Sequence, residues 1–100
     1  MRKAYLLVYS STLGTYDEVK ACLNQIPEVL TWRKDLPSSF YLISETDATT
    51  LARLIRECRG KKGRFLVTEL VDNSNGWLPN ASWYLMQNKR LKPKEQSDIE

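Results

Sequence analysis

Apolar residues in the first segment of the chain occupy odd and even positions alike, from Ala4 to Tyr9. Successive side chains of a strand point to opposite faces of a sheet, so this pattern is typical of a strand buried on both faces. The segment is therefore predicted to be a central strand. Two serines, Ser10 and Ser11, follow it. Many small α/β proteins place a reactive group at such a strand end.

The next segment has helical periodicity. Thr15 stands three residues before Glu18, which is the spacing of a capping box at a helix start. Apolar side chains follow at helical spacing, at Val19, Cys22, Leu23 and Ile26. Pro27 ends the helix, because proline cannot continue the backbone hydrogen-bonding pattern.

A hairpin is predicted after this helix. Residues 28–35 alternate loosely, with Leu30 and Trp32 on one side of a half-exposed strand. Residues 36–39 read Leu-Pro-Ser-Ser, which favours a turn, and the mostly apolar residues 40–44 form the second strand.

A second helix is predicted to begin near Thr46 or Asp47, where a capping side chain suits the positive end of the helix dipole. Its apolar stripe consists of Ala48, Leu51, Leu54, Ile55 and Cys58. Gly60 and Gly63 end it. The last strand runs from Arg64 to Val71. Its two faces carry Phe65, Val67, Glu69 and Val71 on one side, and Leu66, Thr68 and Leu70 on the other.

The order strand, helix, strand, strand, helix, strand predicts an α+β fold of the ferredoxin-like βαββαβ type. Right-handed crossovers place both helices on one face of a four-stranded antiparallel sheet. The other face is then uncovered, and either Tyr5, Leu7 and Tyr9 or else Leu6 and Val8 lie on it. A contiguous apolar patch of this kind marks a binding or dimer surface.

Beyond the last strand, a turn and Trp77 precede a short predicted helix over residues 80–88 that contains Trp83. Both tryptophans would bury large areas if they docked on a sheet of this or a second chain. Residues 1–88 are predicted to form a single ferredoxin-like domain. Residues 89–100 are polar and charged, and we expect a disordered tail.

Composition narrows the possible chemistry. The chain has 100 residues and no histidine, which excludes Ser-His and Cys-His catalysis and His-ligated zinc. The two cysteines, Cys22 and Cys58, fall on helix stripes and are interpreted as small core residues, with a disulfide or a reactive thiol as the alternative. No apolar run is long enough to span a membrane or to form a signal peptide. A cytoplasmic location and no membrane partner are expected.

Charge distribution is more informative than the net charge of +3. Six basic residues fall within twelve positions, namely Arg53, Arg56, Arg59, Lys61, Lys62 and Arg64. They are candidates to contact a phosphate backbone, whereas the alternative is a solvated helix face whose charge complements the helix dipole. Four aromatic residues would stack on bases if they were exposed on the sheet, whereas the alternative is packing in the core or at a dimer interface; they are Tyr9, Trp32, Tyr41 and Trp77.

Three carboxylates are candidate catalytic or metal-binding groups. Asp17 and Glu18 would serve as metal ligands across a dimer axis, or simply as helix-start charges. Glu69 interrupts an apolar strand face and is either an interface or metal carboxylate, or a charge that protects an edge strand. Ser10 and Ser11 have no histidine or positioned lysine to activate them.

These residues resemble a known family. The first strand "YLLVYS", the helix "LARLIREC", the strand "GRFLVTEL" and the trailing "GWLPNASWYLMQN" are similar to small ferredoxin-fold proteins grouped with the CRISPR-associated adaptation subunit and the VapD toxins, particularly SinR-like members. The resemblance covers residues 4–88. It implies a homodimer that brings the first strands together, with a C-terminal segment exchanged or docked across the interface.

In nuclease members of this family an aspartate just after the first strand is proposed to bind a divalent metal. Ser10 stands at the matching position, and a neutral hydroxyl is a poor ligand for such an ion. We therefore expect a small homodimeric binding protein without catalysis and without a cofactor. Its partner is RNA, DNA or another protein in a toxin–antitoxin or defence-type role, and its dimer interface includes Tyr5, Leu7, Tyr9, Trp77 and Trp83. The alternative is a Mg²⁺- or Mn²⁺-dependent endoribonuclease that uses the displaced carboxylates.

Overall fold

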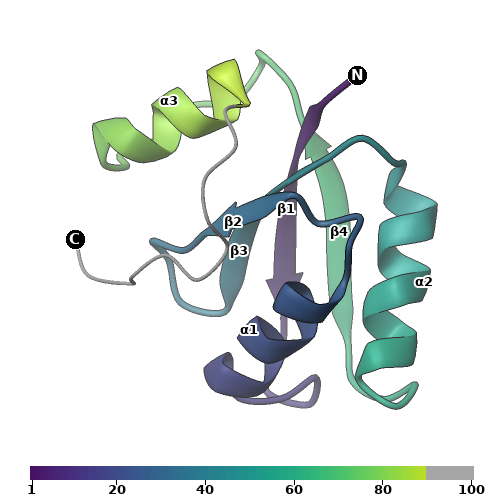
Figure 1. Ribbon diagram of the computed structural model, residues 1–100. Coiled ribbons are helices and arrows are strands. Elements are labelled where there is room, and N and C mark those ends of the chain that lie inside the picture. Colours follow the sequence, from purple (N-terminus) through teal and green to yellow (C-terminus); the bar gives the residue numbers. More distant parts are fainter. Residues whose placement is uncertain (90–100) are drawn as a thin grey trace.

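The computed structural model describes residues 1–89, and its elements follow the predicted order (Figure 1). They are β1 (Lys3–Tyr9), α1 (Tyr16–Gln25), β2 (Thr31–Arg33), β3 (Ser39–Ser44), α2 (Ala48–Cys58), β4 (Phe65–Leu70) and α3 (Asn80–Asn88). The strand predicted over residues 28–35 shortens to β2, and β4 ends one residue before Val71. Most of the predicted disordered tail, from residue 90 on, lies outside the described residues.

The four strands form one antiparallel sheet in the order β2-β3-β1-β4. The predicted central position of β1 is confirmed, because it pairs with β3 on one side and β4 on the other. Tyr5, for example, lies between Leu42 and Glu69. The protein therefore has an α+β fold, and its strand order is compatible with a ferredoxin-like arrangement.

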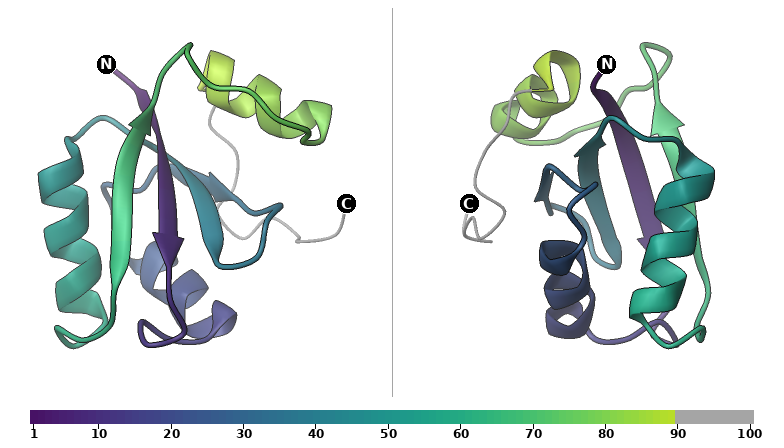
Figure 2. Two further views of the ribbon diagram at one scale, coloured as in Figure 1. Left: turned by 180° about the vertical axis from the view of Figure 1, so that it is seen from behind. Right: turned by 45° about the vertical axis from the view of Figure 1, so that its right-hand side comes forward.

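Helices α1 and α2 cover one face of the sheet (Figure 2). The predicted capping box at the start of α1 is present, with Thr15 and Glu18 each accepting from the other's backbone N–H. Asp47 caps α2 by accepting from the N–H of Thr50. Val19 of α1 and Leu51 of α2 are fully buried against the sheet. None of the helices between residues 1 and 89 has the length and apolar character needed to cross a membrane.

The odd-numbered residues of β1 face these helices, which decides between the two alternatives for the uncovered face. Tyr5, Leu7 and Tyr9 are buried in the core beneath α1 and α2, so their predicted place at a dimer interface is wrong. Leu6 and Val8 point to the other face, where Val8 is 41% exposed.

That second face is only partly open. Helix α3 packs across its β2 and β3 side (Figure 2), and Leu85 and Met86 contact Ala4, Tyr41 and Ile43. The remaining part, toward β4, leaves Val8 and Leu66 accessible to solvent.

Candidate nucleic-acid interface

The six basic residues gather at the end of the molecule where α2 ends and β4 begins. Arg53 and Arg56 lie on the outer side of α2, and Arg59 is its C-cap. Lys61 and Lys62 belong to the loop that leads to Arg64 and β4. All of them except Arg59 are exposed, so the sequence cluster is also a surface cluster.

Three residues of this loop have a left-handed backbone conformation. Gly60, Lys61 and Gly63 have φ angles of 73°, 60° and 87°, and the N–H of Lys61 donates to the carbonyl of Arg56 at 2.7 Å. Gly63 is packed tightly, because an added Cβ there would lie 2.4 Å from the Cα of Leu13. Glycine is therefore required at residue 63 both by conformation and by space.

Ser10 and Thr12, which follow β1, hold this loop. The N–H of Ser10 donates to the carbonyl of Arg64 at 3.0 Å, and the N–H of Arg64 donates to Oγ1 of Thr12 at 3.1 Å. The Ser10 and Thr12 hydroxyls also hydrogen-bond to each other. Ser10 therefore has a structural role in joining the β1–α1 loop to the loop that carries Lys61 and Lys62, called the basic loop below.

Arg59 differs from the other cationic residues because it is half-buried and engaged. Its Nε donates to the carbonyl of Leu13 at 2.9 Å, and its Nη2 lies 3.5 Å from Oε1 of Glu18. The pKa of Glu18 is lowered, first by the hydrogen bond from the Thr15 N–H and then by the positive charges of Arg59 and Lys62. Arg59 thus links α2 to α1 and is less available to a ligand than its neighbours.

Four cations remain for an external ligand. Arg53 has a long contact of 3.7 Å with Glu57, one turn further along α2. Arg56, Lys61, Lys62 and Arg64 have no acidic partner within 4.0 Å among residues 1–89. These four residues are called the basic surface below.

The candidate carboxylates do not come together within the chain. Asp17 and Glu18 occupy the first turn of α1, near the Tyr9 end of β1. Glu69 is exposed on β4 and pairs with Tyr5, which lies four residues from Tyr9 along β1. Glu69 and Asp47, the N-cap of α2, lie at the end of the sheet away from α1's first turn. Burial, followed by the charges of Glu69 and Asp47, raises the pKa of Tyr5. No group of three potential metal ligands forms within residues 1–89.

The aromatic residues proposed to stack on bases are mostly inaccessible. Tyr9, Trp32 and Tyr41 are each less than 10% exposed, so that interpretation is wrong for them. Trp77 is 99% exposed in the connection between β4 and α3. It borders an apolar groove of about 370 Å³ on the second face, which Trp83, half-buried on α3, also lines.

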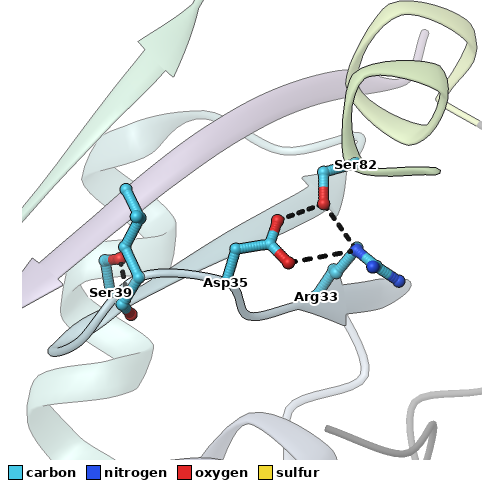
Figure 3. A network of polar contacts seen from close by, with 5 residues as sticks. Arg33, Asp35, Ser39 and Ser82 are labelled. Atoms are coloured by element: carbon cyan, nitrogen blue, oxygen red, sulfur yellow. Dashed lines mark hydrogen bonds and ion pairs between the residues drawn. The ribbon is translucent and has the colours of Figure 1, made fainter. Parts of the chain in front are cut away.

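The sequence did not predict the polar contacts that hold α3 on the sheet. Ser82 of α3 is buried, and its hydroxyl donates to Oδ2 of Asp35 and accepts from Nε of Arg33 at 2.5 Å (Figure 3). Arg33 and Asp35 also form an ion pair at 3.6 Å. Burial raises the pKa of the nearby Tyr41 to about 12, and the charge of Asp35 adds to this effect. Arg33 and Asp35 lie two residues apart in the chain, but nothing in the local pattern indicates Ser82 as their partner.

The two cysteines meet between α1 and α2. Cys22 is buried and Cys58 is half-buried, and both are free thiols. Burial raises the pKa of Cys22, and the neighbouring Cys58 thiol raises it further. A raised pKa lowers the fraction of reactive thiolate, in keeping with the interpretation of Cys22 as a core residue.

Comparisons of the chain with protein-family models, curated proteins and solved structures find no match. The geometry and charge of the surface are therefore the observations that bear on function.

Proposed function

We propose that this protein is a non-catalytic nucleic-acid-binding protein that acts as a homodimer with a ferredoxin-like fold. The observation that carries the proposal is the basic surface, whose four cations are exposed and have no acidic partner within residues 1–89. The resemblance to proteins grouped with the CRISPR-associated adaptation subunit and the VapD toxins supports the fold and the dimer.

Phosphate oxygens fit this surface in charge. Lysine and arginine contacts to phosphates supply most sequence-independent affinity for nucleic acid. The loop that carries Lys61 and Lys62 is fixed by Gly63 and by the Arg64 hydrogen bonds, so less conformational entropy is lost when a ligand binds. If these residues only complemented the dipole of α2, the loop that carries them would not need to be fixed in this way.

The endoribonuclease alternative has less support. Two-carboxylate metal sites need the carboxylates near one another. Within one chain, four residues of strand separate Glu69 from the end of the sheet where Asp17 and Glu18 lie.

The experiment compares binding of labelled single-stranded RNA and DNA at several salt concentrations. Replacing all four residues of the basic surface with glutamine is expected to lower the slope of log K against log salt by up to about 2.8, since each single-strand phosphate contact contributes about 0.7. An unchanged slope would refute the proposed interface.

Two double variants provide a matched comparison. Lys61→Gln with Lys62→Gln and Arg2→Gln with Lys3→Gln each remove two positive charges, but Arg2 and Lys3 lie at the opposite end of β1. We expect the first pair to weaken binding and the second to have little effect. Equal losses would indicate a response to net charge alone.

A further inference from the structure

The two edges of the sheet are not equally protected. Exposed edge strands are usually short or carry lysine or proline, because their unpaired backbone groups invite further pairing. Edge strand β2 has three residues and leads into Lys34 and Pro37. The opposite edge, β4, has six residues, mostly apolar, with neither lysine nor proline. No described strand pairs with its outer side.

The hydrogen-bonding groups on that outer side follow from the register. The N–H of Ser10 donates to the carbonyl of Arg64, and Ser10 lies opposite Arg64 in the register that pairs Tyr9 with Phe65. Bonding toward a neighbour alternates along an antiparallel strand. The even-numbered residues of β4 therefore bond to β1, and Phe65, Val67 and Glu69 direct their N–H and C=O groups outward.

A groove runs beside this edge. It has a volume of about 700 Å³ and is bounded by α2 and β4, which lie side by side (Figure 1). The α2 wall is low because Ala48, Thr49 and Ala52 have small side chains. An added strand would find room for its side chains there.

Charge is divided between the two ends of the groove. Arg56 and Arg64 line the end where β4 begins. Asp47 and Glu69 lie at the other end, because Asp47 caps the start of α2 and Glu69 is one residue from the end of β4. An extended segment with an acidic residue at one end and a basic residue at the other would match this division.

The chain around β4 is itself such a segment, because Arg64 immediately precedes the strand and Glu69 lies near its end. We propose that the β4 strands of two copies pair antiparallel about a two-fold axis at Val67, joining the two sheets into one of eight strands. Phe65 of each copy then pairs with Glu69 of the other, and Val67 pairs with Val67. This proposal rests on the homodimer of the proposed function and places its interface at β4, in contrast to the contact between first strands that the resemblance implies.

The charges favour this register. A two-fold axis perpendicular to the sheet keeps the helix faces of both copies on the same side. Glu69 of the second copy therefore reaches the end of the groove that contains Arg56. The two basic surfaces lie about 20 Å apart along the strands, given about 3.3 Å per residue. Their mutual repulsion is screened at that distance, and a long nucleic acid would bind both at once.

Charge variants test the interface through the dimer dissociation constant, measured by analytical ultracentrifugation without nucleic acid. Glu69→Arg is expected to raise this constant about tenfold or more, because it places like charges together twice. Adding Arg56→Glu to that variant is expected to restore dimerisation. Asp72→Arg, the same charge change just beyond β4, and Trp77→Ser, on the second face, are expected to leave it unchanged.

Cysteine cross-linking tests the register. Leu66 and Thr68 are exposed, and the proposed pairing places Leu66 of one copy opposite Thr68 of the other at a non-hydrogen-bonded position, where Cα atoms are about 4.5 Å apart. Mixing Leu66→Cys with Thr68→Cys protein under oxidation is expected to give a covalent dimer in higher yield than either variant alone.

The outcomes separate this inference from the proposed function. A dimer weakened by Trp77→Ser but not by Glu69→Arg would overturn the β4 interface and leave the homodimer standing. A monomer at micromolar concentration would overturn the interface and the homodimer. The salt dependence of nucleic-acid binding would still test the basic surface independently.

Discussion

Gly63 is the residue on which the position of the basic loop depends most directly. Its φ of 87° is left-handed, and an added Cβ would meet three backbone atoms of Thr12 and Leu13 at 2.4 to 2.7 Å. Backbone atoms cannot move aside as a flexible side chain does. Gly63→Ala is therefore expected to push the basic loop away from the β1–α1 loop and to break the hydrogen bonds at Arg64.

The expected decrease in the free energy of unfolding of Gly63→Ala has two parts. The left-handed conformation costs an L-residue about 1–2 kcal/mol, and an overpacked contact costs about 1–3 kcal/mol more. Gly60 is the matched control, because its φ is 73° but no atom lies within 4 Å of a Cβ there. Gly60→Ala should incur only the first part. The two variants should therefore differ by about 1–3 kcal/mol in the free energy of unfolding.

Urea denaturation followed by circular dichroism at 222 nm measures this difference, and nucleic-acid binding under native conditions measures its effect on the site. We expect Gly63→Ala to be the less stable variant and the weaker binder. Equal stability of the two variants would refute the packing argument. Equal binding with unequal stability would refute the claim that Gly63 positions the basic surface.

Three further predictions concern other parts of the molecule. The pKa of Tyr41 is about 12 in the folded protein and 10.0 without burial, so the free energy of unfolding should fall as pH rises from about 10 to 12. Tyr41→Phe should make that fall less steep in urea titrations at each pH. Ser82→Ala should lower the free energy of unfolding by about 1–3 kcal/mol, because it leaves the buried Asp35 without its hydroxyl donor. Urea denaturation measures this, and a loss below about 0.5 kcal/mol would contradict it. Incubation of labelled RNA with Mg²⁺ or Mn²⁺ should give no cleavage beyond that in chelator, and metal-dependent cleavage would favour the endoribonuclease alternative.

Most elements of this fold could be predicted from the sequence, because their signals are local. The Thr15 and Glu18 spacing marks the start of α1 through hydrogen bonds that span only three residues. Asp47 caps α2 in the same way. The order of these elements then restricts the sheet to few topologies, and the predicted central place of β1 is confirmed.

The basic surface was also within reach of the sequence, since its four residues lie close together in the chain. The sequence did not show which of the basic residues are free to bind a ligand, because Arg59 and its neighbours differ only in tertiary contacts. Arg59 binds Leu13 and Glu18 of a distant segment, whereas Arg56 has no such partner among the described residues.

By itself, the sequence determined which segments form strands and helices, and its capping residues marked where α1 and α2 begin. Only the tertiary structure decided which way β1 faces, since both of its sides are apolar and an alternating pattern has no preferred side until a helix packs on it. The pairing of Tyr5 with Leu42 and Glu69 places Tyr5, Leu7 and Tyr9 in the core, and it leaves the outward groups of β4 unpaired within residues 1–89. Such features depend on contacts between residues far apart in the chain, which local spacing does not encode.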